Sequence, residues 1–251
     1  MAIGSYGDDA EAAAKIKEGF ALPARWDPAM TTLGQALEES RRFWQDPEHG
    51  AMPRDYVEAF KRALAELVQA GLEKHSLQVG QTLPTFSLAN QVGQAVRSED
   101  FLASGPLVLS FYRGGWSPFC ILALRGLQHV LPQIKKLGGS LVAITPELPD
   151  NSLSTVEKLG LSFDVLTDHG LGYARQLGIV WKIPEYALKW QEKYFGVYLE
   201  GYNGAGYRDE LPVPATFIIN RDGTVTWRFL EAAYWQRAEP SDVVEAVRGA
   251  G

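Results

Sequence analysis

One segment of this chain predicts a buried strand and the helix that follows it. The apolar run from Pro106 to Phe111 is typical of a buried strand, and residues 118–136 carry a long helical pattern. Between them, Ser117 before Pro118 is a strong helix start, because serine is a preferred N-cap and proline fits the first helical position. A strand that leads through a short turn into a helix favours an α/β fold.

Cys120 is the only cysteine of the chain, and it falls in the first turn of the expected helix. With Ser117 as the N-cap, the sulfur would lie near unpaired backbone N–H groups and the positive end of the helix dipole. Both favour the thiolate over the thiol, so the position suits a nucleophile. The alternative is an inert cysteine, because free cysteines are among the most often buried residues.

The chain after Gly80 alternates strand and helix patterns. The turn from Asn220 to Gly223 predicts a hairpin near the end, whereas the earlier segments suit parallel crossovers. We therefore expect a mixed central sheet with helices on both faces. The expected strands are residues 85–88, 107–112, 140–145, 164–167, 215–219 and 224–230, and the expected helices are residues 118–136, 152–159, 172–177, 184–195 and 240–247.

The first part of the chain predicts helices rather than strands. Apolar residues form a loose helical stripe over residues 33–44 and a clear one over residues 57–72. We expect residues 1–75 to form an N-terminal helical extension and residues 76–251 to form the main domain. Two helices cannot bury these stripes alone, so they would pack on that domain. Packing on a second subunit, as a homodimer, is the less favoured alternative.

The charge and composition exclude several classes of partner. The 251 residues carry a net charge of −6, with lysine and arginine spread along the chain, which argues against nucleic-acid binding. A single cysteine excludes an internal disulfide framework and suits a reducing compartment. The first nine residues lack the basic and apolar regions of a secretory signal, and no run is long enough to span a membrane. We therefore expect a cytoplasmic protein with no membrane partner.

Metal, cofactor and hydrolytic sites find little support in the sequence. The four histidines are dispersed, and Cys120 has no histidine or second cysteine at ligand spacing. The pair Asp168-His169 suits a loop better than half of a catalytic triad, with a Cys–His site as the alternative. Gly114 and Gly115 form a short turn and no nucleotide-binding loop. We expect no metal and no cofactor.

Several segments, in order along the chain, carry a resemblance to a known family. They are Val79–Leu88, the strand and turn that end at Cys120, Asp150–Leu153 and Val213–Gly223. The region from Val79 to the end of the chain resembles a thioredoxin-fold redoxin of the alkyl hydroperoxide reductase/thiol-specific antioxidant family, which is peroxiredoxin-like. The resemblance implies a thioredoxin-like fold and an oxidoreductase.

The chain departs from this family at its first active-site position. The similar subgroup has a cysteine where this chain has Ser117, so SxxC stands in place of CxxC. Cys120 therefore has no partner for an intramolecular disulfide, and dithiol cycling within one chain is excluded. The pattern still resembles the peroxiredoxin TxxC, in which a hydroxyl residue caps the helix. Ser117 would accept a hydrogen bond from the Cys120 N–H and donate its hydroxyl to the thiolate.

A second departure concerns the arginine that typical peroxiredoxins place near the thiolate. Pro214 stands where that arginine would align, and it resembles instead the cis-proline of thioredoxins, which faces the active-site turn. The proline of the peroxiredoxin motif is replaced by Arg113. Because a guanidinium lowers a thiol pKa and hydrogen-bonds a peroxide, Arg113 is the expected substitute. A surface cation at the end of a strand is the alternative.

Aromatic residues gather in residues 181–212, an insertion before the Pro214 strand. In the redoxin plan this insertion lies near the active-site turn, where tyrosine and tryptophan suit a pocket wall or a subunit interface. Tyr186, Trp190 and Tyr194 recur every four residues, which favours core packing on an amphipathic helix. The stronger pocket candidates are therefore Tyr198, Tyr202 and Tyr207.

These observations lead to the hypothesis of a single-cysteine thiol peroxidase. The Cys120 thiolate would attack hydrogen peroxide or a small organic hydroperoxide. An external thiol of the thioredoxin, glutaredoxin or glutathione type would then reduce the sulfenic acid. A monothiol disulfide-exchange protein and a redox-inactive binding module are the alternatives. The resemblance implies supporting roles for Ser117 and Arg113 at the thiolate, and for Trp116, Phe119 and Pro214 around the substrate.

Overall fold

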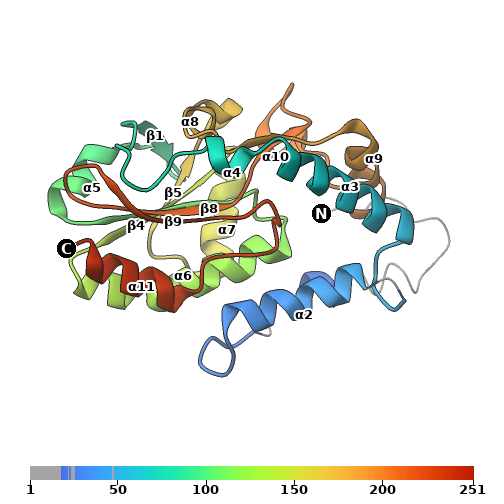
Figure 1. Ribbon diagram of the computed structural model, residues 1–251, viewed down its shortest axis with the longest axis horizontal. Coiled ribbons are helices and arrows are strands. Elements are labelled where there is room, and N and C mark those ends of the chain that lie inside the picture. Colours follow the sequence, from blue (N-terminus) through green and yellow to red (C-terminus); the bar gives the residue numbers. More distant parts are fainter. Residues whose placement is uncertain (1–17, 22, 24–25, 47) are drawn as a thin grey trace.

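The computed structural model describes residues 18–21, 23, 26–46 and 48–251 (Figure 1). Residues 1–9, where no secretory signal is expected, lie outside this part of the chain. Within it, no helix combines the length and the apolar character that crossing a membrane requires.

A mixed sheet of seven strands forms the centre of the molecule. Its strands are β1 (Ser87–Asn90), β2 (Ala95–Arg97), β3 (Leu107–Phe111), β4 (Ser140–Thr145), β5 (Asp164–Thr167), β8 (Ala215–Ile219) and β9 (Val225–Leu230). Their order across the sheet is β2-β1-β5-β4-β3-β8-β9. β3 and β5 pair with β4 in parallel, whereas β8 pairs antiparallel with β3 and with β9. The expected mixed sheet is therefore confirmed.

Helices cover both faces of the sheet (Figure 1), and two further strands pair only with each other. These two strands are β6 (Val180–Lys182) and β7 (Glu210–Pro212). The helices are α2 (Leu33–Gln45), α3 (Arg54–Gln69), α4 (Leu72–His75), α5 (Ser98–Ser104), α6 (Pro118–Lys136), α7 (Pro149–Leu159), α8 (Gly172–Gln176), α9 (Glu185–Phe195), α10 (Glu200–Asn203) and α11 (Pro240–Gly249), with a 3-10 turn η1 (His169–Leu171).

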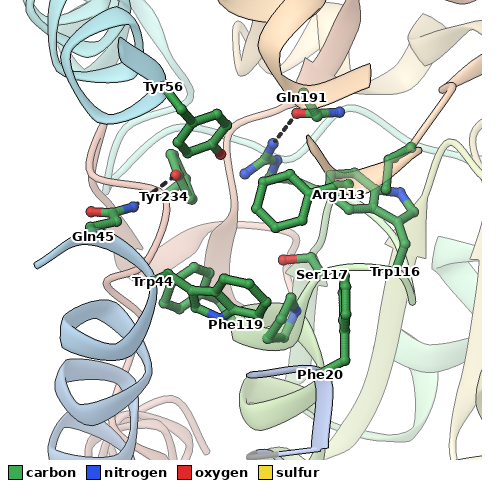
Figure 2. Close-up of a pocket in the computed structure, with 13 residues that line it drawn as sticks. Phe20, Trp44, Gln45, Tyr56, Arg113, Trp116, Ser117, Phe119, Gln191 and Tyr234 are labelled. Carbon is green, nitrogen blue, oxygen red and sulfur yellow. Dashed lines mark hydrogen bonds between the residues drawn. The ribbon is translucent and has the colours of Figure 1, made fainter. Parts of the chain in front are cut away.

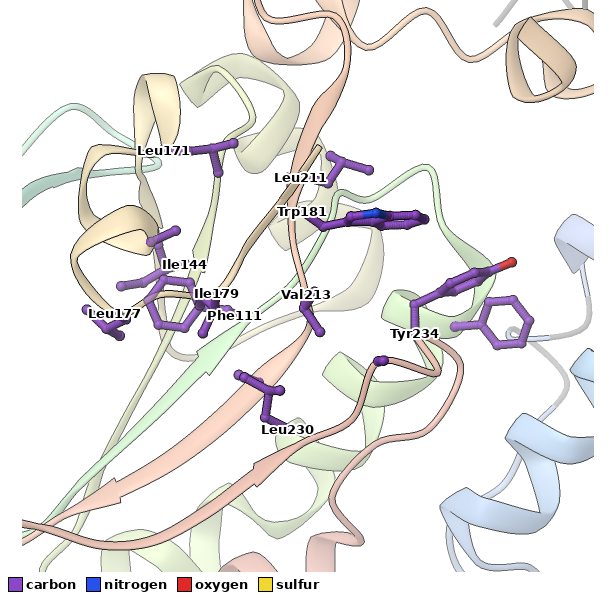
Figure 3. Close-up of a cluster of buried hydrophobic side chains, with 14 of the residues drawn as sticks. Phe111, Ile144, Leu171, Leu177, Ile179, Trp181, Leu211, Val213, Leu230 and Tyr234 are labelled. Carbon is purple, nitrogen blue, oxygen red and sulfur yellow. The ribbon is translucent and has the colours of Figure 1, made fainter. Parts of the chain in front are cut away.

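Alternating residues along the strands divide the core into two layers, because successive side chains point to opposite faces of a sheet. On one face, Val108 and Tyr112 pack with Cys120 among buried side chains of α6 and α11. On the other face, Phe111 and Ile144 pack with residues from the segments around β6 and β7 (Figure 3). The single cysteine therefore belongs to the core between the sheet and α6.

The predicted bounds agree best with the structure where an apolar or helical pattern extends over many residues. β4, β5, β8 and α6 have the expected bounds, and the hairpin turn has Gly223 at a φ of 86°. The strands β2, β6 and β7 and the helices α5 and α10 were not predicted from the sequence. β2 is a three-residue edge strand without an apolar run, and β6 and β7 pair only with each other. Short strands that depend on a distant partner leave little periodic signal.

The N-terminal helices pack on the main domain, which is the arrangement that the sequence favoured. α2 lies along α6, and α3 lies along α9 (Figure 1). Trp44 of α2 and Tyr56 and Phe60 of α3 belong to the same buried cluster as the core of the second face. The division near residue 75 stays a prediction about chain organisation, because this cluster continues across it.

The start of α2 is bound to the segment that precedes α11. Thr32 and Gln35 form a capping box at this end of the helix. The Glu239 carboxylate also accepts hydrogen bonds from the N–H groups of Leu33 and Gly34, at 3.2 and 2.5 Å. A carboxylate there complements the positive end of the helix dipole. Glu239 therefore ties the N-terminal helices to the C-terminal part of the chain.

Glu239→Ala is expected to lower the free energy of unfolding by about 1–2 kcal/mol, because it removes the acceptor for two N–H groups at a helix start. Urea unfolding at neutral pH measures this change. The control is Glu245→Ala, which removes an exposed carboxylate of α11 that pairs with Arg248 and should cost less than about 0.5 kcal/mol. Equal losses for the two variants would contradict the tie to α2.

Candidate active site

The turn between β3 and α6 requires glycine at two positions. A Cβ on Gly114 would lie 2.2 Å from the indole nitrogen of Trp116, and one on Gly115 would lie 2.0 Å from the Thr155 hydroxyl of α7. Both distances are far shorter than van der Waals contact. The two glycines therefore let the turn pack directly against α7 and its own tryptophan.

Ser117 is the N-cap of α6, as expected, but its side chain does not cap the helix. The N–H groups of Cys120 and Ile121 donate to the Ser117 backbone carbonyl, both at 3.0 Å. The expected bond from the Cys120 N–H to the Ser117 hydroxyl is therefore wrong, because that N–H already has a partner. The hydroxyl acts on the sulfur instead, where its hydrogen bond lowers the pKa of the Cys120 thiol.

The Cys120 sulfur is fully buried and lies beside a guanidinium. The residue has no exposed surface, and Nη2 of Arg237 lies 3.5 Å from Sγ. Burial by itself raises the pKa of this thiol. The opposing effects of Arg237, Ser117 and Arg113 outweigh burial and hold the pKa of Cys120 below its ordinary value. The site therefore favours the thiolate, as the position in the helix predicts.

Arg237 is a site residue that the sequence analysis missed. It lies 117 residues after Cys120, in the segment between β9 and α11. Nη1 of its guanidinium donates to the backbone carbonyls of Tyr234 and Gln236, which fixes the group in place. No motif marks this arginine, and the only local signal is a basic residue shortly before the Pro240 helix start. Only the fold brings it to the sulfur.

Arg113 is buried rather than on the surface, and it lies between two aromatic rings. Its guanidinium carbon is 5.0 Å from the centre of the Trp116 ring and 4.4 Å from that of Tyr234. Nη2 donates to Oε1 of Gln191 at 3.4 Å, while Nε has no hydrogen-bond partner. No carboxylate within the described residues pairs with Arg113, and its charge helps to lower the pKa of the Cys120 thiol.

Arg113 and Ser117 line a cavity with mostly aromatic walls (Figure 2). The space open to the centres of water-sized molecules is about 40 Å³, about three times what a single water needs. Trp116 and Phe119 form part of the wall, as expected, and Cys120 does not line the cavity. The remaining wall residues are Phe20, Trp44, Gln45, Tyr56, Pro118, Gln191, Phe195, Val197 and Tyr234.

Pro214 does not take the place that the sequence analysis gave it. It is buried before β8 and lines no part of the cavity, and no peptide bond among the described residues is cis. The expectation of a thioredoxin-like cis-proline beside the substrate is therefore wrong. The residue before it is paired away from the active-site turn, because the Val213 N–H donates to the Ile179 carbonyl at 2.7 Å, in the segment before β6.

The aromatic insertion reaches the cavity through residues other than those expected. Tyr198 is 59% exposed, Tyr207 packs on the His169 ring, and Tyr202 lies in a separate depression. Helix α9, where core packing was expected, and the loop after it supply the cavity wall instead. These wall residues are Gln191, Phe195 and Val197.

Asp168 and His169 form a loop pair, as expected. The Asp168 carboxylate accepts the N–H groups of Tyr173 and Ala174 at 2.9 and 2.8 Å, so its oxygens hold the start of α8. In the part of the chain that the structure describes, no three histidine, cysteine or acidic side chains come close enough together to hold a metal ion.

Comparison with known proteins places this site in a family. A family model described as the AhpC/TSA family matches residues 79–228. A putative peroxiredoxin bcp from Haemophilus influenzae is 29% identical over 150 residues, which are 59% of this chain and 83% of the relative. The peroxiredoxin Bcp of Escherichia coli K12 is 30% identical over 119 residues, which are 47% of this chain and 69% of the relative.

Solved structures show the same fold at low sequence identity. Peroxidoxin BcpB from Mycobacterium tuberculosis matches with a TM-score of 0.53 at 19% identity, over 69% of this chain and 97% of that chain. A cysteine-to-serine mutant of the peroxiredoxin 6 of Arenicola marina matches with a TM-score of 0.54 at 18% identity, over 68% of this chain and 72% of that chain. The expected thioredoxin-like fold is therefore confirmed. Because the family model covers more than half of its residues, this chain belongs to the AhpC/TSA family, as a peroxiredoxin-like redoxin of the thioredoxin superfamily.

Proposed function

We propose that this redoxin reduces peroxides through Cys120 alone. The observation that carries the proposal is the 3.5 Å contact between the Cys120 sulfur and the Arg237 guanidinium, at the first turn of α6. It supplies the low thiol pKa that a peroxide-attacking cysteine needs. The curated relatives named above as peroxiredoxins support a thiol-dependent peroxidase.

The first half of the reaction oxidises the sulfur. The Cys120 thiolate attacks one oxygen of the peroxide, the O–O bond breaks, and an alkoxide or hydroxide leaves and takes up a proton. The sulfur becomes a sulfenic acid. Arg113 has unused donor capacity at Nε and lines the cavity, so it stabilises the charge that develops on the leaving oxygen. Arg237 holds the thiolate before attack.

The second half requires thiols from outside the chain, because the sequence holds one cysteine. A first external thiolate displaces hydroxide from the sulfenic acid and forms a mixed disulfide. A second thiolate then releases the Cys120 thiolate and leaves as a disulfide. The reductant is therefore a thiol of the thioredoxin, glutaredoxin or glutathione class.

The buried sulfur must be reached before it can react. Cys120 does not line the cavity, whereas its neighbours Trp116, Ser117 and Phe119 do, and all three are buried. Opening of the first turn of α6, or rotation of one of these rings, gives a peroxide access to the sulfur. Local opening of this kind costs less than global unfolding. While this turn stays closed, the surrounding side chains shield the thiolate from larger electrophiles.

Cys120→Ala is expected to reduce thiol-dependent consumption of hydrogen peroxide or cumene hydroperoxide to the background rate, because no other thiol exists. Cys120→Ser, which keeps the size of the side chain, should fail equally. Full peroxide turnover by either folded variant would contradict the proposal. A wild-type protein that forms a glutathione adduct but consumes no peroxide would indicate monothiol exchange instead.

Arg237→Met is expected to raise the pKa of Cys120, because it removes the largest opposing effect on the buried thiol. Once the thiol pKa exceeds the ambient pH, each further unit of increase lowers the thiolate fraction about tenfold, and the rate of peroxide attack falls with it. Thiolate absorbance against pH measures the pKa directly. Arg248→Met, on the exposed side of α11, is the control and should leave the titration unchanged. An unchanged pKa in Arg237→Met would overturn the role of Arg237.

Ser117→Cys tests the single-cysteine cycle by restoring the CxxC pattern. After one equivalent of peroxide, the sulfenic acid of Cys120 should condense with the new thiol to an intramolecular disulfide. Intact mass would show a loss of two hydrogens, whereas the wild-type protein gains an oxygen. A variant that gains oxygen like the wild type would show that position 117 is out of reach of the oxidised sulfur.

A further inference from the structure

A group of buried polar side chains lies beside the active-site turn and has no part in the steps above. Its members come from the end of β3, from β4 and the loop after it, and from α7. All are almost completely buried. We call them the Glu147 cluster, and they are Tyr112, Thr145, Glu147 and Ser152. Burying a carboxyl group costs folding free energy unless the group is paired or neutral. The burial of Glu147 therefore suggests that this residue has a function.

Hydrogen bonding within the cluster is incomplete. Oε2 of Glu147 accepts the N–H of Gly115, in the active-site turn, at 2.9 Å. No lysine or arginine of the described residues forms an ion pair with this carboxyl group. The Tyr112 and Ser152 hydroxyls are buried and make no hydrogen bond of good geometry, although Thr145 and Ser152 lie close enough to Tyr112 to lower its pKa. Unpaired buried hydroxyls are rare in native proteins, and they are found where a proton or a reacting group must be handled.

Tyr112 connects this cluster to the sulfur. Its side chain packs with Cys120 in the same buried layer. Burial raises the pKa of the Tyr112 hydroxyl. The negative charges of Glu147 and Cys120 raise this pKa further. Tyr112 is therefore the polar group that lies near both the carboxyl group and the sulfur.

The protonation state of Glu147 changes near neutrality. Burial raises its pKa to about 7, against the lowering effects of the Gly115 N–H and the Tyr112 hydroxyl. The titratable groups that face it are Tyr112 from the end of β3, Tyr202 from α10 and the exposed Lys158 from α7. Burial raises the pKa of both tyrosines, so they stay neutral over the range in which Glu147 titrates.

The proposed function leaves one proton without a source. When an external thiolate attacks the sulfenic acid of Cys120, the new S–S bond forms and the S–O bond breaks. The departing hydroxide needs a proton to leave as water. The cysteine sulfur is reduced in this step, and the external thiol is oxidised. The arginines at the site are unsuited to supply it, because guanidinium groups do not give up their protons in proteins.

We propose that Glu147 supplies this proton through the Tyr112 hydroxyl, as a relay that serves the thiol-dependent reduction of oxidised Cys120. The neutral carboxyl group gives its proton to Tyr112 as Tyr112 gives one to the departing hydroxide. Glu147 is left as a carboxylate and takes up a proton again from solvent through the depression that it shares with Tyr202 and Lys158. The inference rests on the proposed single-cysteine cycle.

The experiment separates the two halves of that cycle. Wild-type protein is oxidised with one equivalent of hydrogen peroxide and then mixed rapidly with 5-thio-2-nitrobenzoate, a coloured thiol that is fully ionised across the neutral range. The rate of its consumption should fall as the pH rises through the pKa of Glu147, about 7, because only the protonated carboxyl group donates. Glu147→Gln keeps an acceptor for the Gly115 N–H but carries no acidic proton. It should lose this pH dependence and react more slowly at the acidic end, by about 100-fold or more.

Tyr112→Phe removes only the hydroxyl group and should show the same loss of pH dependence. This variant also tests the relay if Glu147→Gln folds poorly. The matched controls are Asp168→Asn, at another buried carboxylate that accepts backbone N–H groups, and Tyr173→Phe, at another buried phenol. Both should keep the wild-type pH profile.

The outcomes distinguish the relay from the cycle on which it rests. A wild-type pH profile in Glu147→Gln or Tyr112→Phe would overturn the relay, since a merely structural role would change stability and not the titration. Failure of the wild-type protein to form any sulfenic acid would instead overturn the proposed function. Loss of the pH dependence in both variants, with both controls unchanged, would establish the relay.

Discussion

The buried Cys120 sulfur, held beside a guanidinium inside an apolar core, is the feature on which the rest of this site depends. A thiolate with no exposed surface is unstable unless nearby groups offset the loss of water. Here the Arg237 guanidinium lies 3.5 Å from Sγ, and Ser117 and Arg113 add to its effect on the Cys120 pKa. The glycine turn, the start of α6 and the segment before α11 all serve to bring these groups to one atom.

The N-terminal helices are part of the same arrangement, because the cavity is closed by residues from both ends of the chain. Trp44 and Tyr56 from α2 and α3 face Tyr234 from the segment after β9 (Figure 2). Gln45 donates to the Tyr234 hydroxyl at 3.0 Å, and Glu239 in the same C-terminal segment holds the start of α2. The segment that carries Arg237 therefore also anchors the cavity wall. The packing of the N-terminal helices and the position of Arg237 beside the thiol therefore both depend on the segment between β9 and α11.

The sequence predicts those parts of the structure that rest on local chemistry. The strand, turn and helix around Cys120 follow from apolar runs, glycines and the Ser-Pro helix start, and the structure confirms them. Arg113 could be predicted beside the thiolate because it lies on the same turn. Arg237 and Glu147 could not, because only the packing of α11 and of β4 against the turn brings them there. Pro214 shows the reverse error, since its alignment suggested a cis-proline beside the substrate, whereas its peptide bond is trans and it lines no part of the cavity.

The central claim is that this arrangement makes Cys120 unusually reactive toward peroxides. The most direct measurement is the second-order rate of Cys120 oxidation by stoichiometric hydrogen peroxide, followed by intact mass with a cyclic dione that traps sulfenic acid. The structure predicts a single trapped adduct on Cys120, formed far faster than on free cysteine at the same pH. Oxidation at the rate of free cysteine, or no trapped adduct, would contradict the account.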